Sequence, residues 1–258
     1  MKKLFFSLVI AALLISPTQA FSVEAATNLS KDPNYNTIYK AMVNLKPIVN
    51  VKYNDYVFDV FNKVIEDHPE IFYIDYDTTL LWTNGKLEIG YNGSTKMIKS
   101  QVSSLNKKVN TIYNGSKSKK TTKDKIKYFH DYIINHAKYD IKNYENGTIP
   151  ESSYNAYGVL VKGVGVCQGY AESMKILLDK AKIPNYFVVG FGASNGYWID
   201  HAWNLVKLGR KYYHVDSTWD DPITTSGKQV KTYNYFLIND SKMRKDHKWN
   251  TKKYPKAI

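Results

Sequence analysis

The residue that most directly suggests chemistry is Cys167, because the chain has one cysteine and cannot form an internal disulfide. It follows a glycine-containing run at 163–166 and begins a segment with helical periodicity. At a helix N-terminus, unpaired backbone N–H groups and the helix dipole stabilise a thiolate. The same N–H groups can bind the oxyanion that forms when a thiolate attacks a carbonyl group. Gly165 and Gly169 would let a substrate backbone approach the sulfur.

A predicted hairpin brings a histidine and an aspartate together. Gly209-Arg210 forms a two-residue turn between segments that alternate like strands. In the register that this turn sets, His201 and Asp216 are diagonal neighbours on one face of the sheet. A carboxylate bonded to one imidazole nitrogen fixes the tautomer and leaves the other nitrogen to face a thiol. Cys167, His201 and Asp216 are therefore predicted to form a catalytic triad.

Other interpretations of the same residues remain open. Cys167 alone could be a small buried apolar residue at a helix start, and His201 and Asp216 could be a structural pair. His214 lies on the same predicted face, so His201, His214 and Asp216 also resemble a metal site of two histidines and one carboxylate. The remaining histidines fall in predicted helices or turns, have no identified partner and are interpreted as structural or surface residues: His68, His130, His136 and His247. We favour the triad and expect no metal ion and no cofactor.

Three motifs that carry these residues occur in order along the chain. They are Gly-Val-Cys-Gln-Gly-Tyr-Ala at 165–171, His-Ala-Trp-Asn-Leu-Val at 201–206 and Tyr-His-Val-Asp-Ser-Thr-Trp-Asp-Asp-Pro at 213–222. Together they resemble the core of the transglutaminase-like superfamily, most closely its secreted bacterial members, whose chains continue, as here, into Tyr-Asn-Tyr-Phe-Leu at 233–237. The resemblance implies a papain-like α+β fold, in which the catalytic helix packs against an antiparallel sheet.

The resemblance also implies acyl transfer through a thioester. Cys167 would be the nucleophile, His201 the general base and then acid, and Asp216 the group that orients His201. Water as acceptor would make the chain a protease or amidase, whereas a lysine amine would make it a transglutaminase, which needs a dry tunnel to the sulfur. Polar loops expected at 142–155 and 193–200 favour hydrolysis. An alternative of another class is a non-catalytic cell-wall or surface binding module with an idle triad.

The groups that would bind the oxyanion and line the cleft are expected to be polar or aromatic. Members of the family place an aromatic or amide side chain near the nucleophile to stabilise the oxyanion, and Tyr157 and Gln168 are the candidates here. Trp203 and Trp219 are candidates for the cleft walls. Aromatic core packing explains the two tryptophans equally well.

The elements that must position these residues follow from hydrophobic periodicity. Helices are expected at 34–42, 55–67 and 94–113, from a cap at Thr122, and from 167 to 182, and strands at 71–76, 87–91, 186–192, 201–208 and 211–219. A polar, flexible stretch at 114–120 is the expected domain boundary. We expect a signal peptide at 1–25, a small N-terminal α/β accessory domain at 27–118 and a transglutaminase-like catalytic domain at 119–258.

The N-terminal segment and the net charge indicate where the protein is located and what it binds. Lys2 and Lys3, an apolar run at 4–15 and the small residues Ala20 and Ala25 are typical of a secretory signal peptide. We therefore expect a released extracellular protein that is associated with the cell wall. The net charge of +13 favours attraction to an anionic cell-wall polymer or membrane surface, although scattered lysines also serve solubility. Protein or peptide is the expected substrate, and no motif that reads nucleic acid accompanies the charge.

Overall fold

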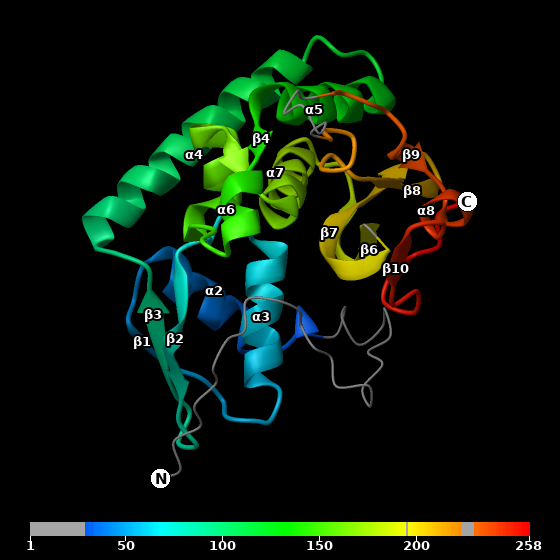
Figure 1. Cartoon of the computed structure of the whole chain (residues 1–258). Helices are drawn as coiled ribbons and strands as arrows, with labels where there is room; N and C mark the ends of the chain where they lie inside the picture. The colour runs from blue at the N-terminus through cyan, green and yellow to red at the C-terminus, as the bar shows by residue number, and fades with distance from the viewer. Residues whose placement is uncertain (1–28, 195, 223–229) are drawn as a thin grey trace. The chain divides into compact units, whose positions relative to one another are not determined.

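The computed structural model describes residues 29–194, 196–222 and 230–258, so the predicted signal peptide lies outside the described residues. The chain divides after Gln101 into two compact units (Figure 1). The domain boundary expected near residue 118 stays a prediction. No helix within the described ranges is both long enough and apolar enough to cross a membrane.

The first unit combines helices with a three-stranded antiparallel sheet in the order β1-β3-β2. Its elements are α2 (Tyr35–Val43), β1 (Ile48–Asn50), α3 (Val57–Asp67), β2 (Ile74–Leu81) and β3 (Lys86–Tyr91). Helix α3 buries Val57, Val60, Phe61 and Val64, which recur at helical spacing on one face. Gly85 lies in the predicted turn between β2 and β3 with φ of 82°, a conformation that favours glycine.

Helices α4 (Thr95–Ser116) and α5 (Thr122–His136) differ from expectation at their ends. The prediction that the polar stretch is flexible from residue 114 is wrong, because α4 continues to Ser116. Ser116 is buried and its hydroxyl donates to the carbonyl oxygen of Tyr113 at 2.7 Å, which holds the last turn. Thr121, rather than Thr122, caps α5, and its hydroxyl accepts the backbone N–H of Asp124 at 3.1 Å.

The second unit is built on a five-stranded antiparallel sheet in the order β10-β6-β7-β8-β9 (Figure 1). Its remaining elements are β4 (Lys138–Tyr139), α6 (Ile141–Asn146), η1 (Glu151–Tyr154), η2 (Gly158–Lys162), β5 (Val164–Gly165), α7 (Cys167–Lys180), β6 (Asn185–Ser194), β7 (Tyr197–Leu208), β8 (Lys211–Val215), β9 (Phe236–Ile238), α8 (Asp240–Met243) and β10 (His247–Trp249). Segregated helices and an antiparallel sheet confirm the predicted α+β class.

Helix α7 packs against the strands β6 and β7. It buries the predicted apolar face: Tyr170, Ala171, Met174, Leu177 and Leu178. The side-chain amide of Asn204 in β7 donates to the carbonyl oxygen of Ala171 at 2.9 Å, in a fully buried position. This bond ties the helix that begins with the cysteine to the strand that carries the histidine.

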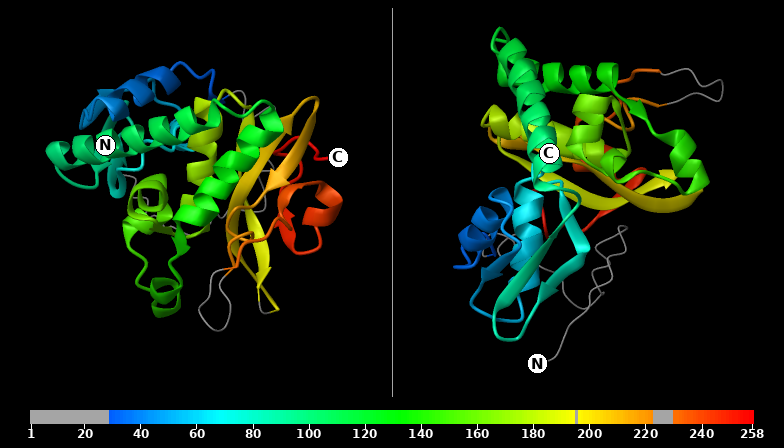
Figure 2. Two further views of the ribbon diagram at one scale, coloured as in Figure 1. Left: turned by 90° about the horizontal axis from the view of Figure 1, so that it is seen from above. Right: turned by 90° about the vertical axis from the view of Figure 1, so that its left-hand side faces the viewer.

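The hairpin of β7 and β8 has the register that the sequence predicts. Leu208 pairs with Lys211, and Gly209 takes φ of 63° in the turn between them. Strands β6 and β7 form the long curved hairpin drawn in yellow in Figure 2. The order β6-β7-β8 therefore places His201 on a central strand, with neighbours on both sides.

Strand β8 is shorter than predicted, because it ends at Val215 and not at Trp219. Asp216 starts a turn at this point. Its Oδ1 accepts the backbone N–H of Thr218 at 3.0 Å and that of Trp219 at 3.1 Å. A short side chain that bonds the backbone two and three residues ahead competes with the strand ladder, and this ends the strand.

The two loops expected at 142–155 and 193–200 are largely regular structure. The first contains α6 and η1. In the second, Ser194 pairs with Tyr197, and Ala193 pairs with Trp198. Aromatic residues favour strands, so the ladder continues almost to the tip of the hairpin. The prediction of two polar loops at these positions is wrong, and these segments therefore give no reason to favour hydrolysis.

Candidate active site

Cys167 occupies the first position of α7. The preceding residue, Val166, has an extended backbone and offers no side-chain cap to the helix. The N-terminus of α7 therefore has no capping side chain, which suits the binding of an oxyanion by its first backbone N–H groups. The Cys167 side chain is half-buried.

Gly165 and Gly169, the glycines near Cys167, are in contact with other parts of the chain. A Cβ added at Gly169 would lie 2.9 Å from the carbonyl oxygen of Ser153 and 3.0 Å from that of Asn155, and one at Gly165 would lie 3.0 Å from the same Ser153 oxygen. Both positions require glycine because another segment of the chain packs directly on them. The expectation that they leave room for a substrate backbone is wrong.

Asp216 is fully buried and accepts four hydrogen bonds. Its Oδ1 accepts two backbone N–H groups, and its Oδ2 lies 2.6 Å from Nε2 of His201 and 3.1 Å from Nε2 of His247. Burial would raise the pKa of Asp216, but the charge of His201 and these hydrogen bonds lower the pKa well below its ordinary value. Asp216 is therefore an ionised carboxylate, which can only accept.

His201 is buried beside Asp216. Its Nε2 donates to Asp216, so Nδ1 is the ring nitrogen that a sulfur atom could meet. Burial lowers the pKa of His201, but the carboxylate of Asp216 and the charge on Cys167 outweigh burial and raise the pKa to about 10. The ring is thus held as an imidazolium beside the thiol, which is the form that can give a proton to a leaving group.

His247 is a residue of this site that sequence reasoning missed. It lies on β10, is 1 % exposed, and meets the same oxygen of Asp216 that His201 meets. The expectation that His247 lies in a helix or turn is wrong, because it is buried on a strand. Since β10 is short and pairs with β6, far away in the sequence, no local pattern identifies this histidine.

His214 belongs to a different network. Its Nδ1 accepts the indole N–H of Trp203 at 2.9 Å, and its Nε2 lies 2.9 Å from Oδ1 of Asp240. The alternative that placed His214 in a metal set with His201 and Asp216 is wrong, because both of its nitrogens are engaged elsewhere.

A different trio has the donor types of a transition-metal site. In the described part of the chain, donor atoms of His201, Asp216 and His247 lie within 4.8 Å of one another. Two hydrogen bonds to one carboxylate oxygen account for this spacing. None of the three is assigned as a metal ligand.

A cluster of tyrosines near Cys167 was not predicted from the sequence. Tyr139 pairs with Gly165 between β4 and β5, and its ring lies 6.0 Å from that of Tyr144. Burial raises the pKa of Tyr139, and the nearby charge of Cys167 raises it further. Burial, Glu151 and Cys167 raise the pKa of Tyr154 in the same way. These hydroxyls stay protonated near the sulfur and can donate to an oxyanion.

The two residues predicted to stabilise the oxyanion, Gln168 and Tyr157, lie on different elements. Gln168 follows Cys167 on α7, and its amide donates to Oε1 of Glu172 at 3.0 Å. Tyr157 precedes η2, and its ring centroid lies 5.5 Å from Nζ of Lys162. A role of Gln168 or Tyr157 in oxyanion binding stays a prediction.

The two tryptophans differ in burial. Trp203 is 1 % exposed and belongs to the core cluster between the sheet and the C-terminal segment, which favours the core-packing interpretation. Trp219 is half-buried, and its ring centroid lies 5.5 Å from that of His201 and 4.3 Å from that of His247. Trp219 therefore remains the candidate for a cleft wall.

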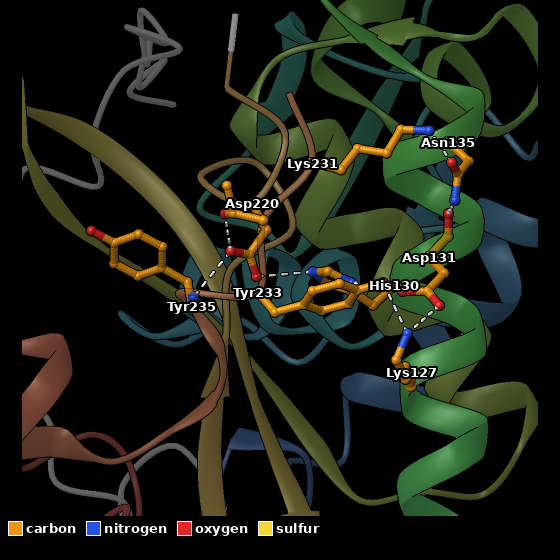
Figure 3. A network of polar contacts seen from close by, with 9 residues as sticks. Lys127, His130, Asp131, Asn135, Asp220, Lys231, Tyr233 and Tyr235 are labelled. Carbon is orange, nitrogen blue, oxygen red and sulfur yellow. Dashed lines mark hydrogen bonds and ion pairs between the residues drawn. The ribbon is translucent and has the colours of Figure 1, made fainter. Parts of the chain in front are cut away.

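The segment that follows Asp216 is anchored to α5 (Figure 3). Asp220 is completely buried, with Oδ2 lying 3.0 Å from Nε2 of His130. Its Oδ1 accepts the hydroxyl of Thr232 at 2.8 Å and the backbone N–H of Tyr235 at 3.0 Å. Further contacts of the network involve Lys127, Asp131, Asn135, Lys231 and Tyr233. His130 is thus the buried partner of a carboxylate, a partner that the sequence did not identify.

Residues 107–217 match the family profile described as the transglutaminase-like superfamily. Two curated relatives are the kyphoscoliosis peptidases of Mus musculus, 27% identical over 144 residues, and Homo sapiens, 26% identical over 155 residues. These matches cover 49% and 54% of this chain but 22% and 23% of the relatives, so the chain spans less than a quarter of their length.

Two solved structures are also similar. One is the "Putative Cysteine Protease from Cytophaga hutchinsonii", with a TM-score of 0.38, 20% identity, and coverage of 49% of this chain and 41% of that chain. The other is a TGase, with a TM-score of 0.41, 15% identity, and coverage of 69% and 47%. The segment that matches the transglutaminase-like superfamily profile, residues 107–217, includes Cys167, His201 and Asp216.

Proposed function

We propose that the chain is a secreted, cysteine-dependent enzyme that transfers acyl groups from amides through a thioester. The observation that carries the proposal is the position of His201. Its Nε2 lies 2.6 Å from Asp216, and the influence of Cys167 on the pKa of the His201 ring supports a sulfur atom close to that ring. A nucleophile, a base and a group that orients the base carry out this chemistry on many unrelated folds, and Cys167, His201 and Asp216 are the residues that we propose for these three roles.

The groups would act in the following order. The Cys167 thiolate attacks the amide carbon, a C–S bond forms, and the carbonyl electron pair moves to oxygen. When the C–N bond breaks, His201 gives the proton on Nδ1 to the departing nitrogen, so an amine or ammonia leaves and a thioester remains. For hydrolysis, His201 takes a proton from water as the oxygen attacks the thioester carbon, and the C–S bond breaks to release the thiolate.

The acceptor is proposed to be water, so that the chain acts as a protease or as an amidase on glutamine side chains. Two observations support this choice. The curated relatives bear the name peptidase, and the Cys167 side chain is partly exposed.

Transglutaminase activity is the second candidate. Tyr139 and Tyr154 favour it, because the influence of Cys167 on the pKa of both hydroxyls supports aromatic rings close to the sulfur, where they would limit the access of water.

The decisive experiment incubates the chain with casein and a fluorescent primary amine. Amine incorporation, ammonia release and peptide cleavage are followed in parallel, with Cys167→Ser as the matched control. We expect cleavage, or ammonia release without incorporation, and loss of either signal in Cys167→Ser because a serine hydroxyl is a far weaker nucleophile than a thiolate. Dominant incorporation of the amine would overturn the choice of water as acceptor.

The same experiment addresses the binding-module alternative. An idle triad would leave all three signals absent on several protein substrates and would leave Cys167 unreactive towards iodoacetamide at neutral pH. We further propose that the mature chain is exported by its N-terminal segment and associates with an anionic surface. The N-terminal sequence of the chain recovered from culture medium tests export, and it is expected to begin after Ala20 or Ala25.

A further inference from the structure

His247 has no role in the three-residue mechanism, yet it is built into the site. It is 1 % exposed, and its ring centroid lies 5.3 Å from that of His201. Its Nε2 lies 3.1 Å from Oδ2 of Asp216, the oxygen that also faces His201. Two imidazoles therefore share one carboxylate oxygen in a buried position.

The other nitrogen of His247 also meets a carboxylate. Its Nδ1 lies 2.7 Å from Oδ1 of Asp246. Asp246 is half-buried, and its other oxygen accepts the hydroxyl of Tyr235 at 2.6 Å. Ionised carboxylates accept and do not donate, so both contacts of His247 are hydrogen bonds only when both ring nitrogens carry a proton. The geometry thus describes a buried cationic ring between two carboxylates.

A cation at this position acts on His201 in two ways. It repels a second positive charge on the neighbouring ring, and it takes part of the negative charge of Asp216 that would otherwise hold the His201 proton. Asp216 keeps its place without His247, because two backbone N–H groups bind its Oδ1. The titratable groups that face His201 or its partner Asp216 are Cys167 on α7, Tyr139 on β4, Tyr235 ahead of β9, and Asp246 with His247 at the start of β10.

We propose that His247 is a positioning residue that acts through Asp216, limiting how tightly the carboxylate holds the His201 proton so that His201 can release it to the leaving nitrogen. This inference rests on the proposed function, since it assigns His201 the transfer of a proton. It adds a fourth member to the site, joined by Asp246 to the partly exposed Tyr235.

The test measures the charge of His201 directly, by nitrogen NMR of the histidine rings in the intact chain. At the pH where the parent His201 ring is half protonated, we expect this ring to be about nine-tenths protonated in His247→Leu, a shift of about 1 pH unit. His247→Gln keeps a hydrogen-bond donor without the charge and is expected to shift less. Asp246→Asn changes a partly exposed residue, which protects the test against misfolding, and is expected to shift the ring in the same direction.

His214→Gln is the matched control, because His214 is an equally buried histidine with a carboxylate partner outside this network. An unmoved or lowered protonation of His201 in both His247→Leu and Asp246→Asn would overturn the inference. An equal shift in His214→Gln would also overturn it, since general repacking would then be the cause.

A parallel arm separates this inference from the proposed function. The rate of Cys167 alkylation by iodoacetamide at neutral pH is compared between the parent and His201→Ala. Equal rates would overturn the triad itself, whatever the NMR shows. Slower alkylation in His201→Ala, together with unmoved His201 protonation in the His247 and Asp246 variants, would leave the triad standing and remove only the role of His247.

Discussion

At the scale of single residues, Asp216 shows how hydrogen bonding overrides burial. An isolated carboxylate in a dry interior would take up a proton, since the charged form loses its solvent. Here two backbone N–H groups and two imidazole rings supply a donor for each lone pair. The charged form is therefore the one that the fold stabilises, and His201 in turn is held as the cation.

Replacing Asp216 with asparagine is expected to reduce turnover by about 1,000-fold or more while His201 remains in place. The amide nitrogen of asparagine would face Nε2 of His201, and it can only donate a hydrogen bond. His201 would then keep its proton on Nδ1 and leave Nε2 unprotonated, which is the wrong tautomer for a base. Turnover in the casein assay measures the loss. Asp200→Asn is the control, because Asp200 is exposed on the same strand, β7, as His201. Equal activity of the two variants would remove Asp216 from the mechanism.

At the scale of elements, two packing features decide where the cysteine and the aspartate lie. The start of α7 packs on the segment at 153–159 through glycines, and the segment after Asp216 is bound to α5 through His130 and Asp220. Each feature can be tested by one substitution that leaves the three proposed catalytic residues untouched.

Gly169→Ala is expected to lower the free energy of unfolding by about 1–3 kcal/mol, because the added Cβ would meet two backbone oxygens that cannot move independently. Urea unfolding measures the change. Gly115→Ala is the control in a helical position, since its Cβ would meet only the end of the Tyr128 side chain, which can rotate away. A larger loss in Gly115→Ala than in Gly169→Ala would contradict this account of the packing.

His130→Gln is expected to lower the free energy of unfolding by about 1–3 kcal/mol, most strongly in mild acid. Burial lowers the pKa of His130, but its bonds to Asp131 and Asp220 raise it by more. A histidine whose pKa is higher in the folded state than in the unfolded state stabilises the fold when it is protonated. This stabilisation is fully present below the pKa of the unfolded state, about 6.5, and is lost as the pH rises through the pKa of the folded state. Urea unfolding at several pH values measures the difference between parent and variant.

His136→Gln is the matched control on the same helix. Burial lowers the pKa of His136, with the charge of Lys108 lowering it further. The stabilising contribution of His136 should therefore be lost as pH falls, the opposite trend to that of His130. Parallel pH trends for the two variants would contradict the assignment of charge to His130.

The elements that the sequence could predict are those determined by neighbours along the chain. The β7–β8 register follows from the Gly209-Arg210 turn and the α7 start follows from periodicity, so the sequence alone is enough to bring His201 to Asp216 and to place Cys167 at the start of a helix. It is not enough for His247, because the position of this residue depends on the pairing of β10 with β6 across a large part of the chain. The sequence did not identify Tyr139 either, because it lies on a two-residue strand, which is too short to show periodicity.

At the scale of the whole molecule, the charge balance is the dominant feature. Lysine and arginine number 36 against 23 aspartates and glutamates, which gives a net charge of +13. Such an excess raises the local concentration of polyanions around the chain without requiring a shaped binding site.

Binding to an anionic polymer such as polyglutamate is expected at low ionic strength and is expected to disappear in about 1 M salt, where the screening length falls to about 3 Å. Co-sedimentation with the immobilised polymer at two salt concentrations measures it. Cys167→Ser should bind equally well, because the charge and not the thiol is responsible. Binding that survives high salt would point instead to a specific site.

The anchor at Asp220 is also connected to the proposed catalytic carboxylate. The Asp220 side chain accepts the hydroxyl of Thr232 and the backbone N–H of Tyr235, and the backbone N–H of Asp220 donates to the carbonyl oxygen of Asp216 at 3.2 Å. One short turn therefore joins a purely structural aspartate to the aspartate that holds His201. Damage to the structural aspartate should consequently impair turnover as well as stability, although it lies outside the proposed triad.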